Sequence, residues 1–189
     1  PGDSDAAAIE AALAEEAATH GDLFRVGAVE SYDSLLLKVL AFFREAVASS
    51  VDASFYLKTD DDVFVRPDRV PAAVAQWDAD GAGYTGCMFL GGEMIADRAS
   101  PFYEPHGPLF SGSRYFGYMS GGFYGLSAQA AAWLGAKQPD TVRLMGCGED
   151  CSVGLQMLAL PVRVVEDWRV CTYGCRPTSI GESGEWVGR

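Results

Sequence analysis

The stretch "FYLKTDDDVFVRPD", residues 55–68, places three consecutive aspartates between one apolar run and a second, "VFV". The first run, residues 53–60, is rich in aromatic and apolar side chains and predicts a buried strand. Side chains at i and i+2 of a strand point to the same face, so Asp60 and Asp62 share a face, with Asp61 opposite, if the extended form persists. If the chain turns there instead, all three carboxylates converge.

Two carboxylates at the carboxyl end of a strand form a natural site for a hard cation such as Mg²⁺ or Mn²⁺. Ligands of open α/β sheets also bind beyond the carboxyl ends of the strands. The alternative is a solvated acidic turn, because motifs this short often occur without a function. The flanking apolar runs argue against a simple surface turn, but the residues alone leave both interpretations open.

Helices and strands alternate along the chain around this stretch. Besides the strand at 53–60, we predict helices over residues 4–18, 31–49, 67–77, 127–136 and 148–160, and strands over 81–90 and 162–166. This order predicts an α/β domain with a mainly parallel, Rossmann-like sheet flanked by helices. No linker divides residues 1–189, so we expect a single domain, with a loop over 91–115 and an irregular, Gly-rich tail over 176–189.

Composition excludes some classes of partner. The 189 residues carry a net charge of −12, which repels phosphate backbones and argues against nucleic-acid binding. No apolar run approaches the ~18 residues of a membrane span, and the acidic, Ala-rich start does not resemble a signal peptide. The chain opens on Pro1, so we expect it to be a piece of a longer protein, attached to a membrane only through an anchor outside this chain.

The five cysteines allow three interpretations. Two C-x3-C pairs occur, "CGEDC" at 147–151 and "CTYGC" at 171–175, and Cys87 stands apart. A four-thiolate zinc site, disulfides in a lumenal compartment and buried thiols are all compatible with this spacing. The odd number leaves at least one cysteine unpaired within the chain.

Four segments of the chain resemble the β-1,3-galactosyltransferase family, which also includes N-acetylglucosaminyltransferases and Fringe-like enzymes. They occur in the family's order and cover about residues 20–165. The segments are "GDLFRVGAVESYDSLLLKVLAFF" (21–43), "FYLKTDDDVFV" (55–65), "YFGYMSGGFYGLS" (115–127) and "GEDCSVGLQMLAL" (148–160).

The resemblance implies a GT-A fold and an inverting hexosyltransferase. Such an enzyme transfers galactose, N-acetylglucosamine or a related hexose from a UDP-sugar to a glycan or glycoprotein acceptor, with a β-1,3 linkage. It further implies a divalent cation, typically Mn²⁺, and a role in protein glycosylation in the Golgi lumen as a type II membrane protein. By position, Asp60, Asp61 and Asp62 match the family's DxD motif, with Asp60 and Asp62 as metal ligands and Asp62 the foremost direct ligand.

The same resemblance assigns the other site residues. Asp150 matches the acidic residue taken as the catalytic base, and Glu149 beside it is the second candidate. We expect the helix N-terminus to favour the ionised form of Asp150, although the residues taken alone favour ordinary helix capping by the two acids over catalysis. Lys58, Gly121 and Gly122 join Asp60 and Asp61 as candidate nucleotide-sugar contacts. The two glycines let the backbone approach a ligand or form a β-bulge.

The chain departs from the family in two places. Nothing before residue 20 resembles the two βα units with which the family begins. Many relatives also carry a metal-binding histidine after the "ED" helix, whereas this chain has only His20 and His106. A catalytically inactive, sugar-binding remnant of a glycosyltransferase is therefore the alternative interpretation.

Overall fold

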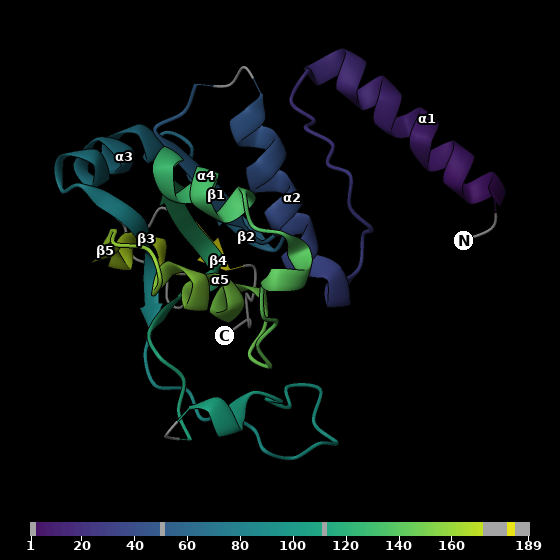
Figure 1. Ribbon diagram of the computed structural model, residues 1–189. Coiled ribbons are helices and arrows are strands. Elements are labelled where there is room, and N and C mark those ends of the chain that lie inside the picture. The colour runs from purple at the N-terminus through teal and green to yellow at the C-terminus, as the bar shows by residue number, and fades with distance from the viewer. Residues whose placement is uncertain (1–2, 50–51, 111–112, 172–180, 184–189) are drawn as a thin grey trace, which may run out of the picture.

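The computed structural model describes residues 3–49, 52–110, 113–171 and 181–183 of the chain (Figure 1). The helices are α1 (Asp3–His20), α2 (Leu35–Ala48), α3 (Val70–Ala79), α4 (Ala128–Gly135) and α5 (Glu149–Met157). Short 3-10 helices are η1 (Tyr32–Ser34), η2 (Gly107–Leu109), η3 (Pro139–Thr141) and η4 (Trp168–Val170). The strands are β1 (Phe55–Thr59), β2 (Val63–Val65), β3 (Ala82–Phe89), β4 (Tyr118–Ser127), β5 (Arg163–Glu166) and β6 (Gly181–Ser183).

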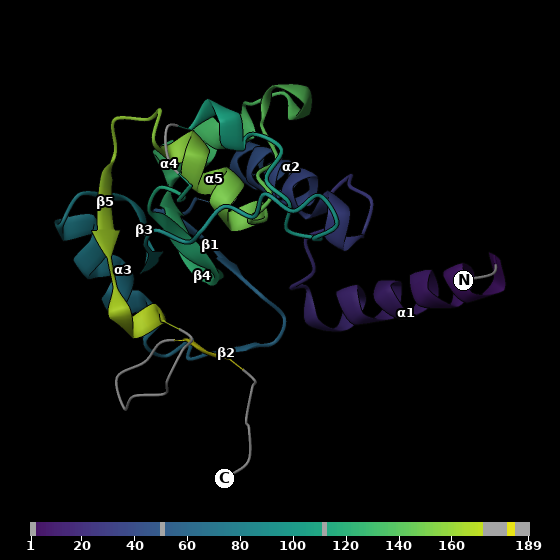
Figure 2. The same cartoon turned by 90° about the horizontal axis from the view of Figure 1, so that it is seen from below.

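The domain has three layers, with helices on both faces of a central sheet (Figure 2). Helices α2, α4 and α5 cover one face, where Tyr124 and Leu126 of β4 join the larger apolar cluster. On the other face, Trp77 of α3 packs with Phe123 of β4. Adjacent β4 residues thus enter opposite layers, as the two-residue period of a strand requires. The predicted α/β class is confirmed.

The expected mainly parallel pairing is wrong. The sheet has the order β1-β4-β3-β5 and is mixed. Strand β4 runs antiparallel to both β1 and β3, and among these pairs only β3 and β5 are parallel. The alternation argument assumed a crossover helix after every strand, but β3 and β4 are joined by a long loop with no α-helix among its described residues. Such a loop lets β4 return antiparallel beside β3.

Local sequence signals set several element boundaries. The Ser127 hydroxyl caps α4 by accepting a hydrogen bond from the Ala130 amide at 3.3 Å. Gly135 allows close packing of α4 on α2, because a Cβ there would lie 2.6 Å from the Arg44 backbone nitrogen. Gly21, at φ +66°, follows the last residue of α1 and adopts the left-handed conformation common at helix C-termini.

Helix α1 stands apart from the layered domain and is joined to it by an extended segment (Figure 1). Its described side chains are mostly exposed, in keeping with an Ala-rich sequence that has no broad apolar stripe. A bidentate ion pair, Arg25 to Glu10, connects the helix to this segment at 2.6 and 2.8 Å. Both partners are exposed, so this pair contributes little stability.

Two disulfides settle the pairing of four cysteines. Cys87 of β3 bonds Cys171, which follows η4, and Cys147 bonds Cys151 across the start of α5. The four-thiolate zinc interpretation is therefore wrong, because these sulfurs cannot act as thiolate ligands. The first C-x3-C motif pairs within itself, whereas Cys171 bonds a distant cysteine; Cys175 lies outside the described residues.

The sequence beyond η4 is described only at β6, which pairs antiparallel with β2 and shows that three residues of the predicted irregular tail are extended. The rest of that tail lies outside the described residues, so the expected domain limits stay a prediction. Among the described residues, no helix has both the length and the apolar character that a membrane crossing requires.

Candidate active site

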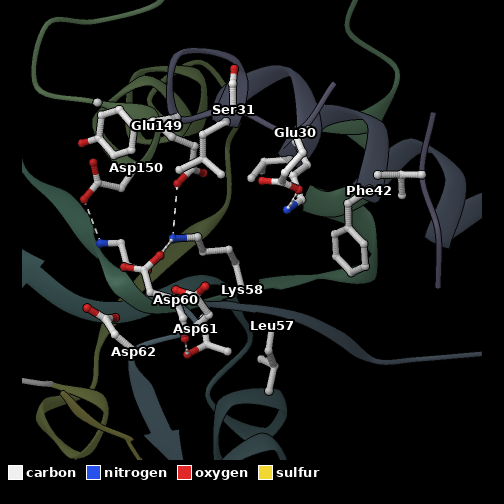
Figure 3. Close-up of a pocket in the computed structure, with 18 of the residues that line it drawn as sticks. Glu30, Ser31, Phe42, Leu57, Lys58, Asp60, Asp61, Asp62, Glu149 and Asp150 are labelled. Atoms are coloured by element: carbon white, nitrogen blue, oxygen red, sulfur yellow. Dashed lines mark hydrogen bonds and ion pairs between the residues drawn. The ribbon is translucent and has the colours of Figure 1, made fainter. Parts of the chain in front are cut away.

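The three aspartates lie in a turn between β1 and β2. The Val63 amide donates to the Asp60 carbonyl at 3.3 Å, which closes the turn. The extended form therefore ends at Thr59 and the chain turns there, while the convergence of all three carboxylates stays a prediction. Asp60, Asp61 and Asp62 all line a single cavity of about 780 Å³ (Figure 3).

Lys58 connects this turn to two other elements. Its ammonium group forms an ion pair with Asp60, donates to the Gly121 carbonyl at 2.7 Å and lies 3.6 Å from a Glu149 carboxylate oxygen. Only 11% of the Lys58 side chain is exposed. One buried cation thus holds the aspartate turn, β4 and the start of α5 around the same cavity (Figure 3).

An irregularity in β4 leaves the backbone amide and carbonyl of Gly121 free of the β3–β4 pairing, so that both can bond side chains of the site. The register of β3 against β4 shifts between Gly86 and Met88, and the paired residues on β4 skip from Tyr124 to Met119. The Gly121 amide then donates to the Asp150 carboxylate at 2.7 Å, while its carbonyl accepts from Lys58. The β-bulge that the sequence offered for these glycines is therefore observed, and the approach of a ligand to their backbone stays a prediction.

A side chain at position 121 has no room. A Cβ there would lie 3.2 Å from the nearer Asp150 carboxylate oxygen and 3.4 Å from the Lys58 ammonium. Gly122 has a different place: it does not line the cavity, but its carbonyl accepts from the Thr59 hydroxyl at 3.0 Å and from the Asp60 amide at 3.4 Å. Gly122 therefore fixes the start of the aspartate turn from outside the cavity.

Glu149 is a buried carboxylate at the first position of α5. It accepts a hydrogen bond from the Tyr124 hydroxyl at 2.6 Å, and 6% of the residue is exposed. Burial raises the pKa of Glu149 to about 7, although the Lys58 charge and the Tyr124 hydrogen bond oppose this rise. Glu149 is thus poised to exchange a proton near neutral pH.

Asp150 follows directly and faces β4. Its carboxylate accepts hydrogen bonds from the amides of Gly121 and Cys151, both at 2.7 Å. We expected the helix N-terminus to favour the ionised form, yet the pKa of Asp150 is raised because burial outweighs these two hydrogen bonds. The Cys147–Cys151 disulfide spans both acids, so it constrains the backbone that carries them.

Sequence reasoning missed the opposite wall of the cavity. Residues between Phe24 and Phe42 form it, including Glu30, Tyr32 and Lys38 from the approach to α2 and from α2 itself. The signal that could have found it was the first of the four resembling segments, 21–43, which covers this wall. Sequence reasoning also missed the Tyr124–Glu149 hydrogen bond, because the two residues are 25 positions apart and meet only through the β4–α5 contact.

The donor set suits a cation that is shared with a phosphate-bearing ligand. Among the described residues, no three His, Cys, Asp or Glu side chains are arranged to hold a metal ion by themselves. Mg²⁺ and similar hard cations instead use one or two carboxylates and complete their coordination with water and substrate phosphates. The aspartate turn offers such carboxylates at the edge of an open cavity, so the residues fit that kind of cation.

The sequence profile of the Galactosyltransferase family matches residues 2–167. The chain belongs to this family. The matched range contains the aspartate turn, the Gly121–Gly122 pair and the acids of α5, and the suspected resemblance is thereby confirmed. The three-layered α/β arrangement is consistent with a GT-A-like domain.

Curated plant proteins show the same relationship. The chain is 35% identical to probable β-1,3-galactosyltransferase 13 of Arabidopsis thaliana over 168 residues, 89% of this chain and 48% of that protein. It is 35% identical to probable β-1,3-galactosyltransferase 12 over 170 residues, 90% of this chain and 45% of that protein. β-1,3-Galactosyltransferase 7 of the same plant is 31% identical, with 86% and 42% covered. This chain therefore spans just under half the length of these relatives.

Proposed function

We propose that this protein is a metal-dependent, inverting glycosyltransferase that transfers a hexose from a UDP-sugar to a glycan or glycoprotein. We propose galactose as the transferred hexose and β-1,3 as the linkage formed, because the names of the relatives contain both terms. N-Acetylglucosamine is the second donor to test. The observation that carries the proposal is the meeting of the aspartate turn and the α5 acids in one cavity.

The two groups of carboxylates divide the chemistry. Asp60 and Asp62 would hold a cation such as Mn²⁺ beside the diphosphate of the donor, and that cation would stabilise the charge on the departing UDP. Lys58, Asp61 and Gly121 lie where they would contact the nucleotide-sugar.

The α5 acids supply the base. Asp150, with Glu149 as the second candidate, would accept the proton of the acceptor hydroxyl as the new glycosidic bond forms on the face opposite the leaving group. The pKa of Glu149, raised to about 7, suits this role, since a general base works best with a pKa near the operating pH, and burial raises the pKa of Asp150 in the same direction.

The two disulfides support a lumenal, oxidising compartment, and we place the protein in the Golgi on that ground together with its family. An inactive sugar-binding remnant is the second candidate. It is favoured by the absence of a histidine after residue 106 in the sequence given.

The decisive experiment separates binding from turnover. Calorimetry with UDP, with and without Mn²⁺, is expected to show metal-dependent binding that Asp62→Asn weakens at least about tenfold, whereas Asp78→Asn on the exposed face of α3 leaves it unchanged. Turnover of UDP-galactose by the complete protein is expected to fall about a hundredfold or more in Asp150→Asn with UDP binding retained. UDP binding that changes neither with Mn²⁺ nor with Asp62→Asn would overturn the proposal. Metal-dependent UDP binding without turnover would favour the inactive remnant.

A further inference from the structure

A second cavity adjoins the candidate active site. It encloses about 400 Å³, which lies within the range of about 300–1,000 Å³ typical of small-molecule sites. Its walls come from η1 and the start of α2, from residues 101–105 of the long β3–β4 loop, and from residues 144–149 before α5. None of the roles in the proposed reaction uses this cavity.

The two cavities share a boundary at Glu149, the second candidate for the base, whereas Asp150 lines only the larger cavity. Tyr32, Leu35, Gly148 and Glu149 line both of them, whereas the three aspartates line only the larger one. Glu149 thus has the proposed donor and cation on one side and the second cavity on the other. A reaction between two bound substrates needs this layout, because the acceptor hydroxyl must reach the base while it faces the donor sugar.

The lining of the second cavity suits an uncharged sugar. Tyr32, Phe102 and Leu144 are 79%, 49% and 51% exposed, so large apolar side chains stand at its rim where a pyranose ring could pack. Its acidic lining residues are Asp33 and Glu149, and none of its described lining residues is Lys, Arg or His. A uronate or sialylated end would meet the exposed Asp33 carboxyl there, and no cationic side chain among the described lining residues would attract it.

The walls are held in place before any ligand binds. Glu104, 3% exposed, accepts hydrogen bonds from the Tyr115 hydroxyl at 3.0 Å, from the Gly146 amide at 2.8 Å and from the His106 amide at 2.8 Å. This carboxylate joins the long loop to the segment before α5. The two backbones touch there, since a Cβ on Gly146 would lie 2.3 Å from the Tyr103 carbonyl oxygen. A preformed cavity lowers the cost of ordering a ligand in it.

We propose that this second cavity is the acceptor site and that it selects a neutral glycan end over an anionic one. The proposal rests on the glycosyltransferase function proposed above and deepens it, because it names the charge class of the acceptor. The acceptor enters between the long loop and α2, packs a sugar face on Phe102 and Tyr32, and presents a hydroxyl to the acids of α5.

Matched sugar probes test the charge selection. Methyl β-galactoside and methyl β-galacturonide differ only in the oxidation of one carbon, and a parallel pair of glucosides covers the other common hexose. With UDP-galactose and Mn²⁺, the complete protein is expected to show an acceptor KM at least about tenfold lower for the neutral member of a pair. Asp33→Lys is expected to narrow that ratio about fivefold or more. Equal use of both members, or preference for the uronide, overturns the proposal.

Variants at the rim of the second cavity test whether the acceptor binds there. Phe102→Ala is expected to raise the KM for the neutral acceptor about tenfold and to change the KM for UDP-galactose less than twofold. Phe64→Ala removes an exposed aromatic side chain from β2, outside both cavities, and is expected to change neither constant. An unchanged acceptor KM in Phe102→Ala, with donor turnover intact, overturns the location and leaves the proposed function standing.

A direct binding readout covers the case of no turnover. Saturation-transfer NMR with methyl β-galactoside is expected to show binding of the sugar to the unaltered protein and to Phe64→Ala, and no binding to Phe102→Ala. If Phe102→Ala abolishes sugar binding and the unaltered protein shows no turnover, the sugar site is supported and the transferase is contradicted. Failure of the sugar to bind the unaltered protein contradicts the site.

Discussion

Glu149→Gln isolates the energetic effect of burying a carboxyl beside the site. Burial raises the pKa of Glu149 from its usual 4.5 to about 7 in the folded protein. The folded state therefore binds more protons than the unfolded state between these two pH values, and stability falls as the pH rises through that window. Below pH 4.5 the effect is absent, and above pH 7 it is complete.

The linkage relation gives the size of the effect. With these two pKa values, ionisation of Glu149 makes folding about 2.5 kcal/mol less favourable at pH 8 than at pH 5. Gln keeps an oxygen that accepts the Tyr124 hydrogen bond and carries no charge at either pH. The free energy of unfolding of Glu149→Gln relative to the unaltered protein is therefore expected to rise by about 2.5 kcal/mol between pH 5 and pH 8.

Urea unfolding of both proteins at the two pH values measures this difference, and titrating groups common to both proteins cancel. Glu16→Gln, on the exposed face of α1, controls for the loss of one negative charge and is expected to show a difference near zero. A Glu149→Gln difference that is the same at pH 5 and pH 8 would refute the reasoning, because Glu149 would then be ionised in the folded protein at both values.

Two further changes test the fold around the site. Gly121→Ala places a methyl group against a carboxylate oxygen and the Lys58 ammonium, so it is expected to destabilise the protein by about 1–3 kcal/mol in urea unfolding; Gly27→Ala, whose Cβ would make only an ordinary 3.7 Å contact, is its control. The double change Cys87→Ser/Cys171→Ser opens a bridge with a sequence separation of 84 and is expected to cost about 4.5 kcal/mol by loop entropy. A loss below about 1 kcal/mol in non-reducing urea unfolding would contradict that entropy argument.

Local structure was largely readable from the sequence. The sequence predicted helices over 31–49 and 127–136, where α2 and α4 lie, and a strand over 53–60, where β1 lies. These features depend on neighbours in the chain. The direction of β4 was not readable, because helix and strand order carries no information about where a long loop returns.

The candidate site was readable in part. The sequence placed the aspartates at the carboxyl end of a strand and assigned the acids of α5 through the family resemblance, and both groups line one cavity. The turn at 60–62, the partner of Cys171 and the cavity beside Glu149 depend on contacts between distant segments. No local pattern specifies those contacts, so the structure was needed to find them.

The bulge at Gly121 has a consequence for how the site can be observed. Its amide is withdrawn from the β3–β4 ladder and is held by a carboxylate of α5. Hydrogen exchange at this one amide therefore depends on the local opening of the acid pair, and its NMR shift responds when the carboxylate gains a proton or moves. A single backbone group thus serves as an intrinsic, label-free probe of the protonation state of the site.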